Sequence, residues 1–202
     1  MKLYFTPGAC SMAPHIALRE ATFKFDLEKV DLAKRQTASG EDYTSINPKG
    51  YVPALRLDNG EVLTEVAVVL QYLADQKPES GLAPKTGTME RYRLMEWLNF
   101  VSSELHKQFS PLFNPRITTE WRANQVASLG RRFDYLTERL DGMPYLMGDQ
   151  FTVADAYLFT VLNWSPSLRV DLAKWPKLKD YLTRVAARPA VKEAMSAEGL
   201  RK

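Results

Sequence analysis

Short runs of alternating hydrophobic and polar residues begin the chain. Residues 2–6 (KLYFT) form a β-rich run that Pro7-Gly8 closes, and helix-compatible residues follow from 14 to 20. Residues 25–32 (FDLEKVDL) alternate with the period of a half-buried strand. This pattern predicts strand, helix and strand before a long polar connection.

A second group of hydrophobic runs follows that connection. Residues 53–57 (PALRL) and 62–65 (VLTE) flank the turn residues 58–60 (DNG), which predicts a hairpin. Residues 66–75 (VAVVLQYLAD) then have the composition of an apolar helix. The order β-α-β, connection, β-β-α is that of a thioredoxin-like unit, in which the first βαβ is parallel and the hairpin antiparallel.

The hydrophobic spacing changes to that of long helices in the rest of the chain. Residues 78–88 (PESGLAPKTGT) have the composition of a domain boundary. We therefore expect an α/β domain over residues 1–80 and an all-helical domain over 88–202. In 122–140, one buried stripe is marked by apolar residues three or four positions apart: Val126, Leu129, Phe133, Leu136 and Leu140.

Two further helical segments carry specific signals. Thr152 and Asp155 have the spacing of a capping box, and Phe151 stands before the cap, so a buried helix is predicted to start there. Residues 90–109 predict one helix with an apolar stripe and a polar row. Because polar helix faces are commonly solvated, periodicity alone favours simple exposure of that row. The polar row consists of Tyr92, Glu96, Asn99, Ser103 and His106.

Composition narrows the function classes. The 202 residues are 45% hydrophobic and 25% charged, a globular balance, and the net charge of +3 comes without a basic run interleaved with aromatic residues. Nucleic acid is therefore not an expected partner. No apolar stretch is long enough to cross a bilayer, and no export signal is visible, so we expect a cytoplasmic protein without a membrane partner. One cysteine and two histidines give no dense metal-ligand cluster, so no metal is expected.

The lone cysteine, Cys10, stands between the Pro7-Gly8 turn and the first turn of the expected helix. A helix N-terminus lowers a thiol pKa from its usual value of about 8.5 and so favours the reactive thiolate. The alternative is an inert, buried cysteine, and position alone leaves both open. Ala13 occupies the second position of a Cys-x-x-Cys motif, so any disulfide must involve an outside thiol.

Two positions near the hairpin are candidates for ligand binding. A proline at Val52-Pro53 cannot donate to a strand ladder, and fold analogy suggests a cis bond that leaves the Val52 N–H and C=O to pair with an extended peptide. Glu65 precedes the helix that begins near Val66, where it can hold a ligand amine while the helix N-terminus attracts a carboxylate. A plain N-terminal helix acid is the alternative for Glu65.

Over essentially its full length the chain resembles the bacterial, beta-class glutathione S-transferases. The resemblance implies a thioredoxin-like domain, a C-terminal helical-bundle domain, a homodimer, and glutathione as co-substrate in a cleft between domains. The segments that carry it are YFTPGACSMAPHIALRE, INPKGYVPAL, LTE before QYLAD, ERYRLMEWLNF, SSELHKQFSPLF and GDQFTVADAYLF.

The resemblance also implies roles for single residues. Cys10 matches the cysteine that forms a mixed disulfide with glutathione, and His106 matches the second active-site residue, serving as base or hydrogen-bond donor. The implied glutathione contacts are Arg35 for the glycine carboxylate, the backbone of Val52 for the cysteinyl unit, Glu65 with the N–H of Val66 for the γ-glutamyl head, and Asn99, Ser103 and Glu104, some from the partner subunit.

Two positions depart from the family pattern. Arg35 stands where a lysine is usual; it keeps the charge but grips a carboxylate with a planar fork. Val66 replaces a small residue, and its β-branched side chain is expected to weaken glutathione binding. His15 also occurs in related chains, and we interpret it as a structural hydrogen-bonding residue.

We therefore hypothesise that the chain is a glutathione transferase that takes part in detoxification. It conjugates glutathione to electrophiles such as activated halides, or exchanges thiols through a Cys10-glutathione mixed disulfide. The alternative is a non-catalytic stress or interaction protein of the same fold, for which Val66 is the best argument. The identity of the electrophile does not follow from the sequence.

Overall fold

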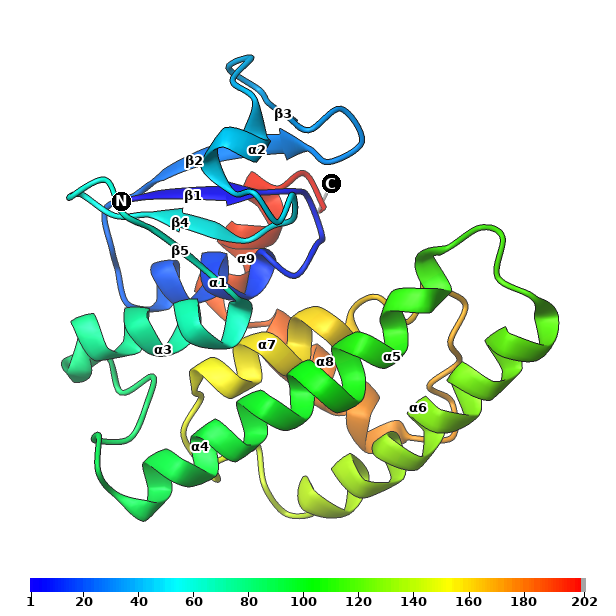
Figure 1. The fold of residues 1–202 in the computed structure, drawn as a ribbon. Helices are drawn as coiled ribbons and strands as arrows, with labels where there is room; N and C mark the ends of the chain where they lie inside the picture. The colour runs from blue at the N-terminus through cyan, green and yellow to red at the C-terminus, as the bar shows by residue number, and fades with distance from the viewer. Residues whose placement is uncertain (201–202) are drawn as a thin grey trace. The chain divides into compact units, whose positions relative to one another are not determined.

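A computed structural model describes residues 1–200 of the chain (Figure 1). Contacts divide these residues into two compact units, which we call unit 1 (Met1–Leu82 with residues 188–200) and unit 2 (Ala83–Ala187). The sequence analysis assigned the whole of 88–202 to the helical domain. Residues 188–200 instead pack with unit 1, and residues 201–202 lie outside the described part.

Unit 1 is built on a five-stranded sheet with the order β3-β2-β1-β4-β5. β1 (Lys2–Phe5) pairs in parallel with β2 (Asp26–Asp31), and helix α1 (Met12–Glu20) connects the two strands along the chain. On its other side, β1 pairs antiparallel with β4 (Ala54–Arg56). β4 pairs antiparallel with β5 (Val62–Thr64). The predicted thioredoxin-like order, with its parallel βαβ and its antiparallel hairpin, is confirmed.

The polar connection between β2 and β4 holds two short elements that the sequence analysis did not predict. β3 (Gln36–Thr37) pairs antiparallel with β2, and α2 (Tyr43–Ile46) follows. Asp42 caps α2, because its side chain accepts the backbone N–H of Thr44 at 2.9 Å. Elements of two and four residues are too short to produce a hydrophobic period, which is why the pattern did not reveal them.

Helices cover the two faces of this sheet (Figure 1). α1 contacts both α3 (Val66–Gln76) and α9 (Pro189–Ala197) on the face opposite α2. Where the chain returns to unit 1, Arg188 holds Glu20 at the end of α1 with two hydrogen bonds of 2.6 and 2.8 Å. A bidentate guanidinium–carboxylate pair fixes geometry as well as charge, so it ties α9 to α1. A short 3-10 turn, Pro78–Ser80, ends this part of unit 1.

Unit 2 is helical throughout. α7 is buried along its whole length, as expected of a helix that is apolar on all sides, and forms the centre of the unit. In α6 the predicted stripe is buried at Leu129, Phe133 and Leu136, each 0% exposed. The elements are α4 (Met89–Phe100), a π-helical turn (Val101–His106), α5 (Lys107–Phe109), a 3-10 turn (Ser110–Phe113), α6 (Thr119–Arg139), α7 (Val153–Leu162) and α8 (Pro176–Ala186).

The predicted capping box at the start of α7 is confirmed. The Asp155 carboxylate accepts hydrogen bonds from the N–H and hydroxyl of Thr152 at 3.0 Å each, and from the N–H of Leu146 at 2.9 Å. The hydroxyl of Tyr181 in α8 adds a fourth at 3.0 Å. Complete burial nevertheless raises the pKa of Asp155 to about 6, because these neutral donors only partly replace water around the charge.

The segment 90–109 is not the single α-helix that its periodicity predicted. α4 ends at Phe100, and the π-helical turn Val101–His106 follows before α5. A π turn accommodates an extra residue, so it rotates the residues after it relative to those before it. The predicted polar row therefore does not continue in one line to His106: Asn99 and Ser103 are exposed, whereas His106 is half-buried.

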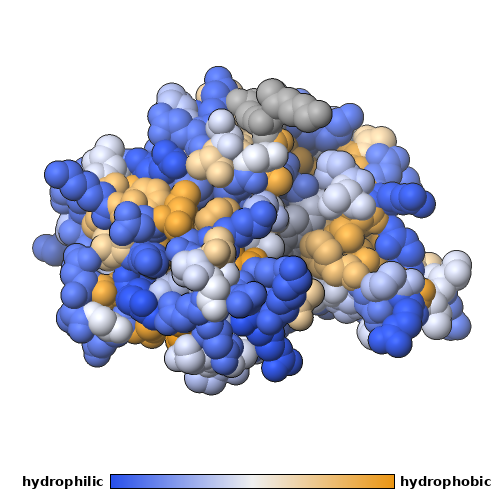
Figure 2. Space-filling model, turned by 90° about the horizontal axis from the view of Figure 1, so that it is seen from above, coloured by the Kyte–Doolittle hydropathy of each residue, from blue (hydrophilic) through white to orange (hydrophobic). Residues whose placement is uncertain are grey.

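The buried hydrophobic residues form a core inside each unit. Hydrophilic residues cover most of the face shown in Figure 2, and hydrophobic residues form separate patches on it. Within residues 1–200, no helix has both the length and the hydropathy needed to cross a bilayer. His15, Asp155 and Glu198 are among the polar residues buried in this interior, and burying such groups is costly unless they have hydrogen-bond partners.

Candidate functional site

Cys10 lies on the loop that joins β1 to α1, two residues before the helix begins. Gly8 turns this loop with a φ of 71°, a conformation that favours glycine. The N–H groups of Met12 and Ala13 donate to the loop carbonyls of Ala9 and Cys10 at 3.0 and 3.2 Å. The sulfur thus lies at the expected place near the N-terminus of α1, where the helix dipole favours a thiolate, while these two N–H groups are used within the loop.

The Val52-Pro53 peptide bond is cis, as expected. The Cys10 thiol donates a hydrogen bond to the carbonyl of Val52, with a sulfur–oxygen distance of 3.1 Å. The sequence analysis expected this carbonyl to be left for a ligand, whereas here it holds the thiol. Because only the protonated thiol donates, a thiolate would release the Val52 carbonyl.

Glu65 stands immediately before α3 in a strained conformation, with φ 69° and ψ 118°. A non-glycine residue in such a region is uncommon, and such strain is often found at functional positions. Its carboxylate lies 2.6 Å from the ammonium of Lys49, which also donates to Thr64 at 3.0 Å. Both side chains are exposed, so this ion pair contributes at most about 1 kcal/mol and is easily exchanged.

Lys49 is a residue of this region that the sequence analysis did not single out, although it lies within the quoted motif INPKGYVPAL. Only the fold brings it to Glu65, across 16 positions of sequence. Val66, by contrast, is 6% exposed, so its side chain is packed and not solvated.

Arg35 lies on the exposed turn between β2 and β3, with a φ of 54°. Its carbonyl accepts the N–H of Tyr43 at 2.9 Å, which joins this turn to α2. Hydrogen bonds from Thr44 lower the pKa of Asp42, and the charge of Arg35 lowers it further.

His106 is the last residue of the π-helical turn, and aromatic groups surround its ring. Its Nδ1 lies 2.7 Å from the hydroxyl of Tyr157, which is in α7. The imidazole meets the ring of Tyr157 at 88° and that of Trp164 at 66°, with centroid distances of 5.9 and 5.0 Å. The sequence analysis did not predict either partner, although Tyr157 lies in the quoted motif GDQFTVADAYLF.

The three remaining candidates in unit 2 are Asn99, Ser103 and Glu104, and only the first two contact each other. The hydroxyl of Ser103 donates to the carbonyl of Asn99 at 2.9 Å, and both residues are exposed. Glu104 turns instead toward α6, where Arg132 donates to one of its oxygens at 3.0 and 2.6 Å. Glu104 would have to leave Arg132, or share it, to contact a ligand.

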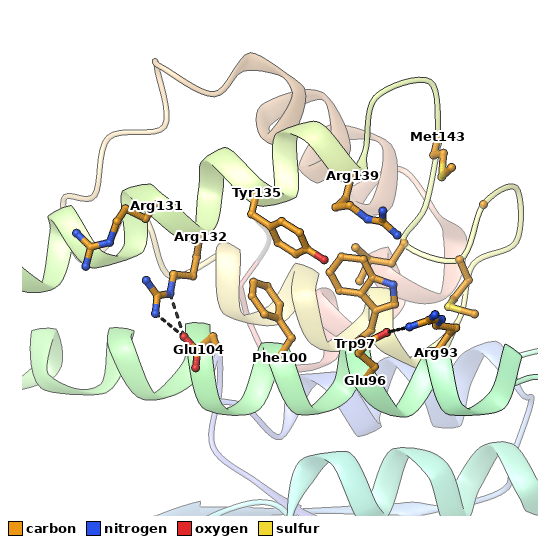
Figure 3. A pocket seen from close by; sticks show the side chains of 13 residues that line it. Arg93, Glu96, Trp97, Phe100, Glu104, Arg131, Arg132, Tyr135, Arg139 and Met143 are labelled. Atoms are coloured by element: carbon orange, nitrogen blue, oxygen red, sulfur yellow. Dashed lines mark hydrogen bonds and ion pairs between the residues drawn. The ribbon is translucent and has the colours of Figure 1, made fainter. Parts of the chain in front are cut away.

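A cavity of about 690 Å³ lies between α4 and α6 (Figure 3). Trp97, Phe100 and Tyr135 form its aromatic wall, with ring centroids 5.3 to 5.9 Å apart. The ion pairs Arg93–Glu96 and Arg132–Glu104 lie at its border (Figure 3). The sequence analysis did not predict this cavity.

His15 has the structural environment that the sequence analysis expected. It is 0% exposed, and its Nδ1 lies 2.8 Å from one oxygen of the Glu198 carboxylate. Arg19 donates to its Nε2 at 2.9 Å, and the other Glu198 oxygen accepts the N–H of Gly8 at 2.8 Å. Since Gly8 belongs to the Cys10 loop, this network connects the end of the described chain to that loop.

The sequence candidates therefore fall into separate groups. In unit 1, Cys10 contacts Val52, and Glu65 and Val66 stand together at the start of α3. Arg35 lies on the separate turn between β2 and β3. Unit 2 holds the remaining ones: Asn99, Ser103, Glu104 and His106. Among residues 1–200, no three or more His, Cys, Asp or Glu side chains are grouped so that they could hold a metal ion.

Comparison with known proteins identifies the family. The family model described as "Glutathione S-transferase, N-terminal domain" matches residues 8–76. The model described as "Glutathione S-transferase, C-terminal domain" matches residues 100–189. Glutathione S-transferase GstA of Escherichia coli O157:H7 is 45% identical over 201 residues, which cover 100% of both chains. The chain belongs to the glutathione S-transferase family.

Solved structures of this family are similar to the chain throughout. A bacterial beta-class glutathione S-transferase from Sphingomonas chungbukensis has a TM-score of 0.96 at 47% identity, with 100% of both chains covered. A sphingomonad glutathione S-transferase in complex with glutathione has a TM-score of 0.95 at 49% identity, also covering 100% of both. The expected resemblance and the glutathione S-transferase fold are confirmed.

Proposed function

We propose that the protein is a glutathione transferase with Cys10 and His106 as catalytic residues. Support comes from the full-length similarity to a sphingomonad enzyme that was solved with glutathione. The observation that carries the proposal is the place of Cys10. This single thiol is only partly buried, lies before the N-terminus of α1, and bonds the backbone beside a cis-proline.

The charges of glutathione match groups of unit 1. Its γ-glutamyl end carries an ammonium and a carboxylate, and its glycine end carries a second carboxylate. We assign the ammonium to Glu65, which would exchange Lys49 for the ligand, and the neighbouring carboxylate to the N–H of Val66 at the start of α3. Arg35 binds the glycine carboxylate, and the backbone of Val52 pairs with the cysteinyl unit.

The contacts from unit 2 complete this proposal. Asn99 and Ser103 are exposed and available to a ligand or to a partner subunit, and Glu104 joins them if it releases Arg132. His106 acts on the glutathione sulfur. The packed side chain of Val66 offers no hydroxyl, so the γ-glutamyl carboxylate depends on the backbone N–H.

Two reactions use this arrangement. In conjugation, the glutathione thiolate attacks an electrophilic carbon, a carbon–sulfur bond forms, and the carbon–halogen bond breaks to release halide. In thiol exchange, the Cys10 thiolate attacks the glutathione sulfur of a disulfide between glutathione and a substrate thiol, which forms the Cys10-glutathione mixed disulfide and releases the substrate thiolate. A second glutathione thiolate then attacks the mixed disulfide, which releases oxidised glutathione and regenerates Cys10.

Calorimetry with reduced glutathione tests binding, and the lone cysteine makes the test of chemistry unambiguous. We expect heat and thermal stabilisation at roughly millimolar ligand, and a single glutathionyl adduct on the protein by mass spectrometry after incubation with oxidised glutathione. Cys10→Ala should lose the adduct and the disulfide exchange while it retains glutathione binding. Absence of both heat and stabilisation would instead favour the non-catalytic alternative.

We also propose that the enzyme is a homodimer and that it detoxifies electrophiles in the cytoplasm. A reducing compartment suits a chain that contains a single cysteine. For the dimer we propose the cavity between α4 and α6 as part of the interface. Tyr135 and Met143 line this cavity, and their exposed fractions are 43% and 48%. A second copy of the chain would remove this apolar surface from water.

Analytical ultracentrifugation tests the dimer. Tyr135→Glu places a charge on the cavity wall and should shift the protein to a monomer. The matched control is Trp121→Glu, which changes a similarly exposed aromatic residue near the start of α6, outside the cavity lining. A wild-type monomer, or an equal effect of both variants, would contradict the proposed interface.

A further inference from the structure

We infer that Tyr157 is a positioning residue that selects the imidazole tautomer of His106 with its proton on Nε2. The Tyr157 hydroxyl lies 2.7 Å from Nδ1, and the Tyr157 residue is 1% exposed. In this arrangement His106 is a hydrogen-bond donor to the glutathione sulfur and not a general base. The tautomer is inferred only from contacts within unit 2. The role of His106 toward the glutathione sulfur rests on the proposed function.

The direction of the hydrogen bond decides the tautomer. A phenol has one proton, which it keeps at neutral pH because the ordinary tyrosine pKa is about 10. Burying a hydroxyl proton without an acceptor costs free energy, and Nδ1 of a neutral imidazole is a good acceptor that lies 2.7 Å away. When Tyr157 donates to Nδ1, the single proton of the neutral ring resides on Nε2.

Neighbouring groups fix the plane of the imidazole. Trp164 meets it on a second side at 66°, and Phe113 and Phe109 in turn contact Trp164 at ring-centroid distances of 5.3 and 6.0 Å. His106 itself ends the π-helical turn, whose changed register directs it toward α7. A ring held on two sides is hindered from the rotation that would exchange its nitrogens.

This tautomer determines which chemistry is open to His106. A nitrogen that already carries a proton has no lone pair with which to accept another, so Nε2 can donate to a thiolate but cannot deprotonate a thiol. A hydrogen bond donated to the charged form favours that form, so the contact stabilises the glutathione thiolate. Tyr157 thus separates the two roles that the sequence analysis left open for His106.

His15 provides an internal reference for the opposite tautomer. Arg19 donates to its Nε2, so the proton of the neutral ring lies on Nδ1, which donates to Glu198. His15 and His106 are the only two histidines in the chain, and their ring nitrogens should therefore give two distinct patterns in one spectrum.

Nitrogen-15 NMR of the imidazoles tests the tautomer directly. In wild-type protein at about pH 8, above the ordinary histidine pKa of about 6.5, we expect one ring protonated at Nε2 and one at Nδ1. His106→Asn should remove the first pattern, which assigns it. A His106 ring protonated at Nδ1 in the wild type would overturn the inference without any variant at Tyr157.

Tyr157→Phe removes only the hydroxyl and keeps the aromatic ring. We expect the His106 nitrogens to shift toward a mixture of tautomers while the His15 signals stay unchanged. The matched control is Tyr181→Phe, which deletes another buried hydroxyl of unit 2, one that bonds Asp155 and not His106. Unchanged His106 signals in Tyr157→Phe, or an equal change in Tyr181→Phe, would overturn the positioning role.

Kinetics with glutathione and an activated aryl halide test the link to catalysis. For Tyr157→Phe we expect kcat to fall about tenfold, with KM for glutathione within about twofold, while Tyr181→Phe keeps the wild-type kcat. An altered tautomer with unchanged kcat would overturn the role toward sulfur. If wild-type protein binds no glutathione, the proposed function fails, and the NMR result still decides the tautomer.

Discussion

The two histidines of this chain are fixed by different kinds of partner. His15 in unit 1 is fully buried between two charged groups, Arg19 on Nε2 and Glu198 on Nδ1. His106 in unit 2 is half-buried, and the hydroxyl of Tyr157 and the ring of Trp164 hold it. The first environment is charged and closed, and the second is neutral and aromatic.

The difference shows that an imidazole can be fixed by charged partners or oriented by a neutral one. Changing the protonation of His15 would break a contact with Arg19 or Glu198, so this ring works as a connector between α1 and the segment after α9. A neutral partner such as Tyr157 orients His106 without adding a charge that would compete with a thiolate. The predictions below test this contrast, from the largest expected effect to the smallest.

Glu198→Ala should cause the largest loss of stability. It leaves the His15 Nδ1–H and the Gly8 N–H without this acceptor, and a hydrogen bond to a charged group typically contributes about 1.5–3 kcal/mol for each donor. Urea unfolding measures the loss. The matched control is Glu193→Ala, which removes another partner of Arg19 but an exposed one, and should cost less than about 1 kcal/mol. Equal losses would show that the His15 network is no stronger than a surface contact.

The same variant tests whether this network supports the Cys10 loop. Gly8 loses its side-chain partner in Glu198→Ala, and Cys10 is two residues away, so we expect the alkylation rate of Cys10 to change. Glu193→Ala should alkylate at the wild-type rate. An unchanged rate in folded Glu198→Ala would separate the structural network from the reactive loop.

Asp155→Asn should remove a pH dependence of stability that comes from unit 2. The folded-state pKa of Asp155, raised by burial to about 6, lies above its unfolded value near 3.8. Between these pH values the folded state binds the proton more tightly than the unfolded state does. The contribution of this carboxyl to the free energy of unfolding is therefore complete below about pH 4 and is lost as the pH rises through about 6. The loss amounts to at most about 3 kcal/mol.

Urea unfolding from about pH 4 to pH 7 measures this difference. Wild-type protein should lose more stability over the range than Asp155→Asn. The control is Asp149→Asn, an exposed residue shortly before the capping box, which should follow the wild-type curve. Parallel curves for wild type and Asp155→Asn would contradict the raised pKa.

Local signals in the sequence were sufficient for most of the fold. Alternation predicted β1 and β2, the turn residues 58–60 predicted the hairpin, and Thr152 with Asp155 predicted the start of α7. Each signal lies within a few residues of the element that it predicts. The cis bond at Val52-Pro53 was different, since only the analogy with the expected fold suggested it.

The elements that escaped prediction depend on tertiary structure or leave too short a pattern. The π-helical turn at Val101–His106 adds a residue without changing the local composition, so its register shift is invisible to spacing. The return of α9 to unit 1 depends on pairs far apart in sequence, such as His15 with Glu198. Short elements such as β3 lack room for a period.

The candidate site followed the same division. Cys10, Glu65 and His106 could be named because motifs surround them. Their partners could not be, since Tyr157 lies 51 positions from His106, and Lys49 lies 16 from Glu65. The sequence thus named candidate groups for the chemistry, and the fold supplied the neighbours that set their hydrogen bonds.

His106→Asn should have the smallest effect on stability. The ring is half-exposed, and an asparagine amide can still bond the Tyr157 hydroxyl, so we expect a loss below about 1 kcal/mol in urea unfolding. Conjugation of glutathione to an aryl halide should nevertheless fall, because an amide donates to sulfur from a different position. The informative control is His15→Asn, which should lose several times more stability, since it leaves Arg19 and Glu198 without their shared partner. If His106→Asn destabilised the protein as much as His15→Asn, both histidines would be structural connectors, and the contrast between a charged and a neutral environment would not explain function.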